Sequence, residues 1–250
     1  MGRFDLTDVE WAVVEPLLPT DVRGKERVYD RRVLNGFFWR LRTGAPWANI
    51  PAPYGPYTTC GNRFRRWRKR GIRGRLLDAM SKVYDADLQM IDASSVRVHQ
   101  HAACANKEGG SGGMGRSRGG LTSKIHALVD AEGRPVALKI TEGQAHDGRS
   151  AADMLDGLGA GQILLGDRAY DSDALRARMA EQGAWANVKP MPNRKQVLAF
   201  SPFLFKYRNL VEPFFGKIKY FRAIAKRYDK DPDNFLASVE LAALRIWMRA

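Results

Sequence analysis

Long apolar runs are missing from this sequence, and cysteine is scarce. No stretch of eighteen apolar residues occurs, which argues against a membrane-spanning helix. The first twenty residues carry acids and lack a cleavable apolar core, so a secretory signal peptide is not expected. The two cysteines, Cys60 and Cys104, form no CxxC pair, which is typical of reduced thiols. We therefore expect a cytoplasmic protein without membrane contact.

Acidic residues are also few. The 250 residues include 41 Lys and Arg but only 27 Asp and Glu, which gives a formal net charge of +14. Such an excess destabilises a compact chain through self-repulsion, and a polyanionic partner is its usual explanation. Nucleic acid is the favoured partner, with an anionic membrane surface or simple solubility as alternatives. The apolar fraction of 44% is that of a globular chain with a real core.

The amino-terminal part is predicted to be helical. Residues 5–18 place apolar side chains at helical spacing, and Thr7 with Glu10 matches a capping box. Residues 30–41 repeat the helical pattern, and Gly44 closes it.

A basic run, NRFRRWRKRGIRGR at residues 62–75, follows without a single acid. If it is helical, Phe64 and Trp67 face the core while the cations fan outward toward phosphates. We interpret residues 1–82 as a small helix-turn-helix-like DNA-binding domain, with a solvated basic face as the alternative. The predicted DNA contacts in this run are Arg63, Arg65, Arg66, Arg68, Lys69 and Arg70.

The periodicity changes at residue 88. Strands are expected over 88–98, 124–130 and 136–140, as a three-strand meander. Later segments alternate: helices over 147–158 and 173–182, strands over 162–167 and 185–188, and a closing helix over 234–247. This order predicts an α/β domain over 83–250, with a mixed sheet and helices on both faces.

A glycine-rich segment separates the first two of these strands. Residues 106–120 contain seven glycines, which are expected to prevent regular structure, and Arg116 and Arg118 add charge. Two interpretations remain open for the loop at 105–120: a mobile segment that faces DNA, or a disordered linker.

Carboxylates stand where the apolar strands end. Asp92 follows the apolar approach LQMI, Asp167 ends QILLGD, and a later helix carries Glu212 on one stripe with Arg208 and Lys219. Three such carboxylates can bind a pair of hard divalent cations, which clamp the attacking and leaving oxygens of a phosphodiester displacement. We therefore predict nucleic-acid phosphoryl transfer, with Arg208 and Lys219 binding phosphate oxygens.

The segments that carry these residues resemble a known family. IDASSVRVH, GRSRGGLTSKIHALVDAEGRP, LLGDRAYDS and RNLVEPFFGKIKYFRAIAKRYDK are similar to successive blocks of bacterial DDE insertion-sequence transposases, in the branch related to insertion sequences four and five. The segments DLTDVEWAVVEPLLP, GAPWANIP and FRRWRKRG extend the resemblance over essentially the whole chain. The resemblance implies a ribonuclease H-like catalytic domain with two Mg²⁺ ions, for which Mn²⁺ can substitute.

The resemblance also assigns roles. Asp92, Asp167 and Glu212 match the three family acids that bind metal, and Arg208 and Lys219 match their basic companions. It implies that water cuts the phosphodiester at the end of the element, freeing a 3′-hydroxyl that attacks target DNA. The partners would be double-stranded terminal inverted repeats and target DNA, bound by a homodimer in the bacterial nucleoid.

Two positions depart from the family pattern. Phe205 stands where the family often has Tyr, so a ring contact can survive but a hydroxyl contact cannot. Pro213 removes a helix donor and disfavours α geometry at Glu212. The helix is therefore expected to begin or kink there, with Arg208 in a preceding turn.

Three alternatives stay open from the sequence. The same acids would serve a ribonuclease H-like nuclease or recombinase without strand transfer, and a catalytically silent DNA-binding regulator would keep only the basic surface. Zinc binding is the third alternative, although HxHxxC is a poor match to common zinc spacings. Its ligands would be His99, His101 and Cys104, with His126 or His146 as the fourth.

Overall fold

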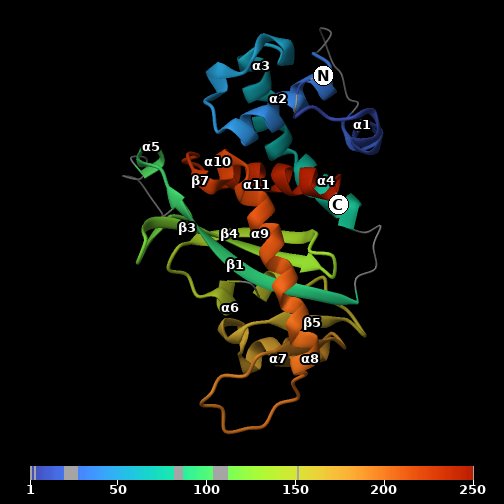
Figure 1. Ribbon diagram of the computed structural model, residues 1–250, viewed down its shortest axis with the longest axis vertical. Coiled ribbons are helices and arrows are strands. Elements are labelled where there is room, and N and C mark those ends of the chain that lie inside the picture. Colours follow the sequence, from blue (N-terminus) through green and yellow to red (C-terminus); the bar gives the residue numbers. More distant parts are fainter. Residues whose placement is uncertain are drawn as a thin grey trace.

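The computed structural model of the chain describes residues 2, 4–19, 28–81, 87–103, 112–150 and 152–249. Figure 1 shows the amino-terminal helices at one end of a mixed sheet, with α11 lying between them and the sheet. The amino-terminal elements are α1 (Asp8–Val14), η1 (Glu15–Leu17), α2 (Asp30–Thr43), η2 (Trp47–Asn49), η3 (Ala52–Tyr54), α3 (Tyr57–Lys69) and α4 (Ile72–Ser81).

The predicted helix signals of the amino-terminal part are confirmed. Thr7 accepts from the Glu10 backbone N–H, and the Glu10 side chain accepts from the Thr7 backbone N–H, so the capping box is complete. Gly44 ends α2 in the left-handed conformation at φ 72°, which favours glycine. The first helix is shorter than expected, because α1 changes at Glu15 into the 3₁₀ turn η1 before Pro16.

Aromatic packing holds α2 against α3. The ring of Phe37 makes edge-to-face contacts with Trp47, Phe64 and Trp67 at centroid distances of 5.9, 5.6 and 5.7 Å. Phe64 and Trp67 are both 3% exposed, which confirms that they form the inner face of the basic helix.

The sheet is mixed, as predicted. Along its main path the order is β2-β3-β1-β5-β6, with β4 on β3 and β7 on β1. The meander β1-β3-β4 is antiparallel, whereas β5 is parallel to β1 and β6 is parallel to β5. The strands are β1 (Leu88–Val98), β2 (Gly115–Ser117), β3 (Gly120–Asp130), β4 (Pro135–Glu142), β5 (Ile163–Gly166), β6 (Trp185–Val188) and β7 (Lys226–Arg227).

Both faces of the sheet are covered. Successive residues of β1 point to opposite faces, and each face packs against its own core. Met90 belongs to a core shared with α9, α11 and the amino-terminal helices, whereas Ile91 packs with Leu175 and Met179 of α7. The remaining helices are α5 (Gln100–Ala103), α6 (Asp147–Ser150), η4 (Ala152–Leu155), η5 (Arg168–Tyr170), α7 (Asp173–Glu181), α8 (Pro202–Phe205), η6 (Lys206–Leu210), α9 (Val211–Lys219), α10 (Arg222–Ala225) and α11 (Pro232–Trp247). Within the described ranges, no helix has both the length and the apolarity to cross a membrane.

Two expectations about local structure are wrong. Residues 115–120 are not irregular, because β2 pairs with β3 in a tight hairpin, and Gly120, at φ 91°, begins β3 opposite Ser117. Residues 104–111 of the same glycine-rich segment lie outside the described residues. The expected helix over 147–158 is short, since α6 ends at Ser150 and η4 spans Ala152–Leu155.

His126 is a buried histidine that couples stability to pH. It is fully buried on β3, its Nε2 lies 2.7 Å from Thr141 Oγ1, and its Nδ1 has no hydrogen-bond partner among the described residues. Burial lowers the pKa of His126 to about 4, because a protonated ring would bury a second N–H without an acceptor. The neutral ring therefore contributes stability that is present above the unfolded pKa and lost as pH falls toward 4.

We expect this histidine to cost the fold about 2 kcal/mol between pH 7 and pH 5, where the unfolded chain binds a proton that the folded chain does not. Urea unfolding at several pH values measures this loss. His126→Gln should flatten the dependence in that window, whereas His146→Gln, which alters an exposed histidine, should leave it unchanged. An equally steep pH dependence in the His126 variant would contradict the assignment.

Candidate active site

Asp92 and Asp167 are neighbours because β1 and β5 are parallel and in register. Met90 pairs with Leu165, and each acid lies two residues beyond that pair. The edge of β1 that pairs with β5 up to Met90 pairs again only at Arg97, with β7. Between these two pairings, at Asp92, this edge of β1 is open. The sequence suggested that Asp92 ends its strand, but Asp92 is the fifth residue of the 11-residue strand β1. The strand that ends at this level is the neighbouring β5, whose last residue is Gly166.

One guanidinium joins the three predicted acids. Arg208 Nη2 donates to Asp92 Oδ2 at 3.0 Å and lies 3.9 Å from Asp167 Oδ2, while Nη1 lies 4.0 Å from Glu212 Oε1. The side chains of Asp92, Asp167 and Glu212 are 20%, 39% and 68% exposed, so the site opens toward Glu212. Arg208 Nε is buried and has no hydrogen-bond partner among the described residues.

The helical segments α8, η6 and α9 bring the late residues across the sheet (Figure 1). As expected from Pro213, the α-helix begins beside Glu212, at Val211, and Arg208 lies in the preceding 3₁₀ turn η6. At the other end of α9, Lys219 Nζ donates to Ser94 Oγ at 2.6 Å. Ser94 is two residues beyond Asp92 and on the same face of β1, so Lys219 also lies beside the acids.

The electrostatics of Asp92 are dominated by its burial. Burial raises the pKa of Asp92, the Ala93 N–H and the charge of Arg208 oppose the rise, and the negative charges of Asp167 and Asp147 add to it. Asp147 was not among the predicted site residues, because the sequence showed it only as a helix start. Its carboxylate accepts from Lys124 Nζ at 2.7 Å.

Tyr170 is a second neighbour that the sequence did not indicate. The residue is 1% exposed, and its hydroxyl has no hydrogen-bond partner among the described residues. Burial raises the pKa of Tyr170, and the negative charges of Asp147, Asp92 and Asp167 raise it further, so the hydroxyl stays protonated beside the acids. Tyr170 lies three residues after Asp167 in LLGDRAYDS, but residue type and spacing alone do not distinguish it from a core aromatic.

The donor set fits a hard divalent cation. Three carboxylates converge on one positive charge, and carboxylate oxygens are the ligands that magnesium and manganese prefer. In this structure the Arg208 guanidinium lies among the three carboxylates. Among the described residues, no three His, Cys, Asp or Glu side chains are close enough together to hold an ion directly. The same statement covers His99, His101, His126 and His146 of the zinc alternative, whose remaining candidate ligand, Cys104, lies outside the described part.

The predicted DNA contacts divide into exposed cations and cations that are held in ion pairs. Arg65, Arg66, Lys69, Arg70, Arg116 and Arg118 are exposed. The expectation that Arg63 points outward is wrong: it is 4% exposed, forms an ion pair with Asp30 and donates to the Val28 carbonyl at 2.9 Å. The α3 face that buries Phe64 also buries its neighbour Arg63, which therefore needs an internal partner.

Arg68 is the second correction. Its side chain is 18% exposed and forms an ion pair with Asp231, the N-cap residue of α11, with Asp233 3.8 Å away. Arg68 therefore joins the amino-terminal helices to the closing helix, and a role in DNA contact is not supported by its placement.

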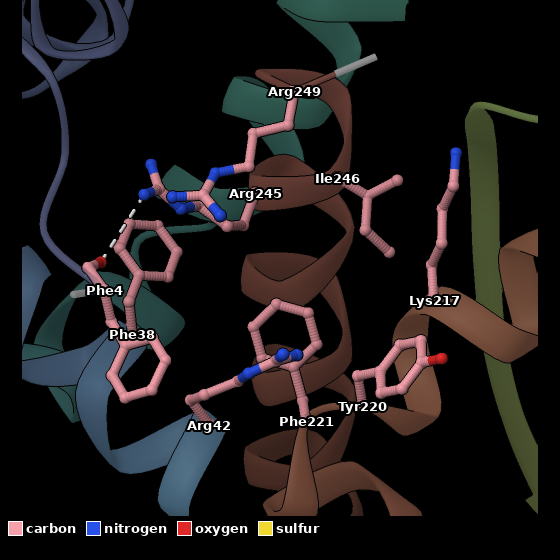
Figure 2. Close-up of a pocket in the computed structure, with 9 residues that line it drawn as sticks. All are labelled: Phe4, Phe38, Arg42, Lys217, Tyr220, Phe221, Arg245, Ile246 and Arg249. Atoms are coloured by element: carbon pink, nitrogen blue, oxygen red, sulfur yellow. Dashed lines mark hydrogen bonds between the residues drawn. The ribbon is translucent and has the colours of Figure 1, made fainter.

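A separate cavity of about 330 Å³ lies where the amino-terminal helices meet α9 and α11. Figure 2 shows aromatic and cationic side chains around it, among them Arg42, Tyr220 and Arg245. None of the three predicted acids lines this cavity. Arg245 and Arg249 are both ion-paired to Glu10, at 2.6 and 3.3 Å, so part of its positive charge is already neutralised.

A mixed sheet of this order, covered by helices on both faces, has the ribonuclease H-like fold. Residues 84–247 match the family described as "Transposase DDE domain", and residues 6–77 match "Putative transposase of IS4/5 family". The chain belongs to the DDE transposases, a family of enzymes that depend on divalent metal.

Relatives from bacteria carry insertion-sequence names. The chain is 41% identical over 131 residues to the "Putative transposase for insertion sequence element IS6501" of Brucella ovis, which covers 52% of this chain and 100% of that sequence. It is 31% identical over 112 residues to the transposase of insertion sequence element IS1106 of Neisseria meningitidis, which covers 41% of this chain and 39% of the relative.

A solved structure supports the fold. The piggyBac transposase in a synaptic complex with hairpin DNA matches with a TM-score of 0.55, covering 94% of this chain and 69% of that chain at 9% identity. At that identity the likeness concerns the fold alone.

Proposed function

We propose that this transposase binds the ends of its own element and cuts and joins DNA at Asp92, Asp167 and Glu212. The observation that carries the proposal is the convergence of these three carboxylates on the guanidinium of Arg208. Two of the acids are fixed by strand register and the third by a helix, so backbone geometry holds them together.

The three acids would hold two Mg²⁺ ions, with Mn²⁺ as a substitute. When bound, the ions supply a positive clamp for the oxygens of an in-line phosphodiester displacement. Arg208 is close enough to all three acids to offset part of their negative charge before the ions arrive, and its fork can then bind a phosphate oxygen of DNA. Lys219 places a second positive charge over Ser94, on the other side of Asp92.

The exposed cations would hold double-stranded DNA outside the site. Residues 1–82 serve as the DNA-binding module and residues 83–250 as the catalytic domain. Arg65, Arg66, Lys69 and Arg70 on or next to α3, and Arg116 and Arg118 on the β2–β3 hairpin, contact phosphates of the terminal inverted repeats or of target DNA. Bringing two element ends together requires a homodimer on DNA, acting on the bacterial nucleoid in the cytoplasm.

Incubation of the purified chain with the DNA that flanks its own gene tests the proposal. In Mg²⁺ we expect cuts at the element end that leave a 3′-hydroxyl, followed by joining of that end to a plasmid, while Ca²⁺ should support binding without cleavage. Gel analysis of end-labelled DNA reads both steps. Cutting without joining would favour the nuclease alternative, and binding without cutting in Mg²⁺ or Mn²⁺ would favour a silent regulator.

A further inference from the structure

The proposed chemistry makes no use of the cavity of about 330 Å³ between the amino-terminal helices, α9 and α11. Phe4 lies ahead of α1, Phe38 comes from α2, and the rest of the wall is formed by α9, the residues just after it and α11. None of the described residues that line it is an acid, and four of them are cations. A cavity of this size, walled by rings and charged groups, is typical of sites that take a small molecule.

The positive charge of this cavity is only partly compensated. Glu10 is the carboxylate that pairs with two of the cations, Arg245 at 2.6 Å and Arg249 at 3.3 Å. The other two, Arg42 and Lys217, form no ion pair with any residue that the structure describes. One carboxylate paired with cations of a set of four leaves the cavity with a net positive charge, which attracts an anion.

The Arg42 guanidinium is held by rings and not by a carboxylate. Its central carbon lies 5.5 Å from the ring centroids of Tyr220 and Phe221 and 5.9 Å from that of Phe4. Figure 2 shows Arg42 reaching from α2 toward Phe221. At these distances a cation is attracted to the ring face, and a ring leaves the N–H donors of the guanidinium available. Within the described part of the chain, no oxygen accepts from the Arg42 side chain, so its donors can bind a ligand.

Arg245 gives the cavity a wall that is already in place. It is 4% exposed, its Nη2 donates to the Asp5 carbonyl at 2.8 Å, and its guanidinium carbon lies 5.2 Å from the ring centroid of Phe38. Phe38 itself is 1% exposed. A cation and a ring that are buried and fixed in this way need little ordering when a ligand enters, which favours binding.

We propose that this cavity binds a small ring-bearing anion, an aromatic phosphate, sulfonate or carboxylate about the size of one nucleotide. Its ring packs against Phe38, Phe221 and Ile246, and its anionic group binds Arg42 and Lys217. An inorganic anion would leave the aromatic walls without a partner, and a neutral ring would leave the two cations uncompensated. Duplex DNA is far too wide to enter a cavity of about 330 Å³.

A ligand in this place joins the two parts of the chain. α2 belongs to the amino-terminal module, whereas α9 carries Glu212 and Lys219 of the candidate active site. Lys217 and Tyr220, which line the cavity, lie two residues before and one residue after Lys219. Because the ligand contacts both parts only in the folded chain, its binding raises the melting temperature. This inference goes beyond the proposed function and does not require that the three acids cut DNA.

Isothermal titration of the full chain with AMP, adenosine and inorganic phosphate tests the proposal, in buffer without divalent metal. AMP carries a ring and an anion, adenosine lacks the anion, and phosphate lacks the ring. We expect AMP to bind at least about tenfold more tightly than either. A second probe, 8-anilinonaphthalene-1-sulfonate, should gain fluorescence on binding and be displaced by AMP. If neither AMP nor this sulfonate binds, or if phosphate binds as tightly as AMP, the proposal is wrong.

Three matched substitutions locate the site. Arg42→Gln and Lys217→Gln should each weaken AMP binding about tenfold, because each removes a charge-assisted hydrogen bond to the anion. Lys217 is exposed, so Lys217→Gln should melt at the wild-type temperature without ligand. Arg222→Gln is the control: Arg222 is an exposed cation directly after Phe221 that does not line the cavity, and its variant should keep wild-type affinity. Equal losses in all three variants would show only a general attraction of anions to a basic chain and would overturn the proposal.

Competition separates a small ligand from DNA. A duplex carrying the element end, added in Ca²⁺, should not displace AMP. If it does, the cavity is part of the DNA-binding surface and the proposal is wrong. A chain that binds AMP in an Arg42-dependent way but neither binds nor cuts this duplex would leave the inference standing while the proposed function fails.

Discussion

Replacing Asp92, Asp167 or Glu212 by its amide is expected to lower strand cleavage at least roughly a thousandfold, the scale seen when one member of a catalytic unit is removed. Asn and Gln keep the size of each side chain but supply no negative charge for a divalent cation. Because the three acids converge on one guanidinium, they should act as one unit. The double variant Asp92→Asn/Asp167→Asn should therefore cut no more slowly than the worse single variant.

Binding and a control substitution separate this effect from misfolding. Binding of element-end DNA in Ca²⁺ should stay within about threefold of wild type, since phosphate contacts from basic side chains carry most of the affinity. Asp153→Asn removes a carboxylate that is 63% exposed and paired with Lys139, outside the site, and should leave cleavage unchanged. If Asp167→Asn still cut DNA in Mg²⁺, the assignment of the three acids would be wrong.

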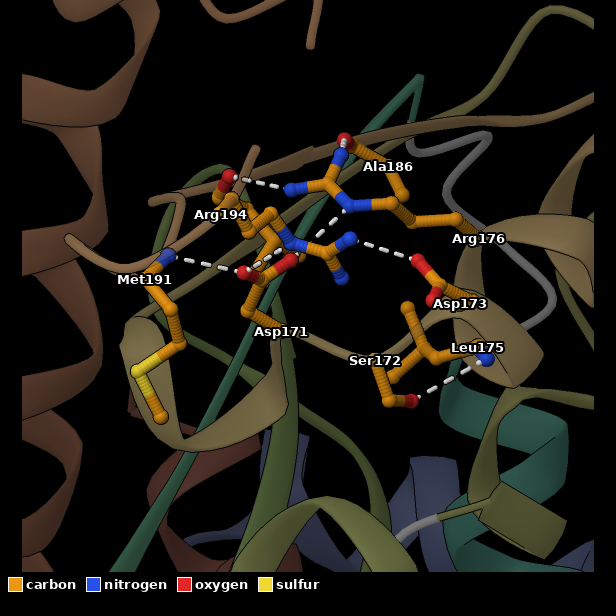
Figure 3. Close-up of polar contacts among 9 residues, drawn as sticks. Asp171, Ser172, Asp173, Leu175, Arg176, Ala186, Met191 and Arg194 are labelled. Carbon is orange, nitrogen blue, oxygen red and sulfur yellow. Dashed lines mark hydrogen bonds and ion pairs between the residues drawn. The ribbon is translucent and has the colours of Figure 1, made fainter. Parts of the chain in front are cut away.

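Loss of the Asp171 carboxylate is expected to have the largest effect on stability. Its side chain is fully buried, and burial alone would raise its pKa, but hydrogen bonds from Arg194, Met191 and Arg176 hold that pKa below the ordinary value. Asp171→Asn removes the buried counter-charge that two largely buried guanidinium groups share (Figure 3), leaves Arg194 only the exposed Asp173, and turns an amide donor toward them. We expect a loss of about 3–5 kcal/mol, which lowers the melting temperature by roughly 10 °C.

Asp173 provides the matched comparison on the same arginine. It accepts from Arg194 Nη1 at 2.5 Å, but its side chain is 87% exposed, so solvent screens the pair. Asp173→Asn should cost no more than about 1 kcal/mol. Thermal unfolding of both variants, followed by circular dichroism, makes the comparison. Similar losses for the two would show that burial does not set the strength of this network.

Local sequence signals predicted the position of a helix or strand correctly where that position depends on residues close together in the sequence. The capping box of Thr7 and Glu10, the left-handed Gly44 and the apolar runs of β1 and β6 depend on neighbours in the sequence, and each element appears where it was expected. The helix start beside Pro213 was predictable for the same reason, because proline constrains the residue before it.

The composition of the basic run gave wrong predictions where a residue far away in the sequence determines whether a side chain is exposed. Arg63 belongs to an uninterrupted basic run, yet Asp30 pairs with it in the core. Arg68 is likewise taken up by Asp231 of α11, 163 residues later. Glycine content also misled at 115–120, because pairing with β3 supplies the order that the local sequence lacks.

The sequence by itself predicted the main strands, three candidate acids and the family, because each of these predictions depends on residue type and short-range spacing. Only the tertiary structure decided that Asp92 meets Asp167 at an open edge, since this follows from the register of two strands far apart in the chain. It also decided that Arg208 lies among the acids, that Asp147 and Tyr170 join them, and that Met191 and Arg194 bind Asp171. Burial and charge act through space, so these relationships have no local signature in the chain.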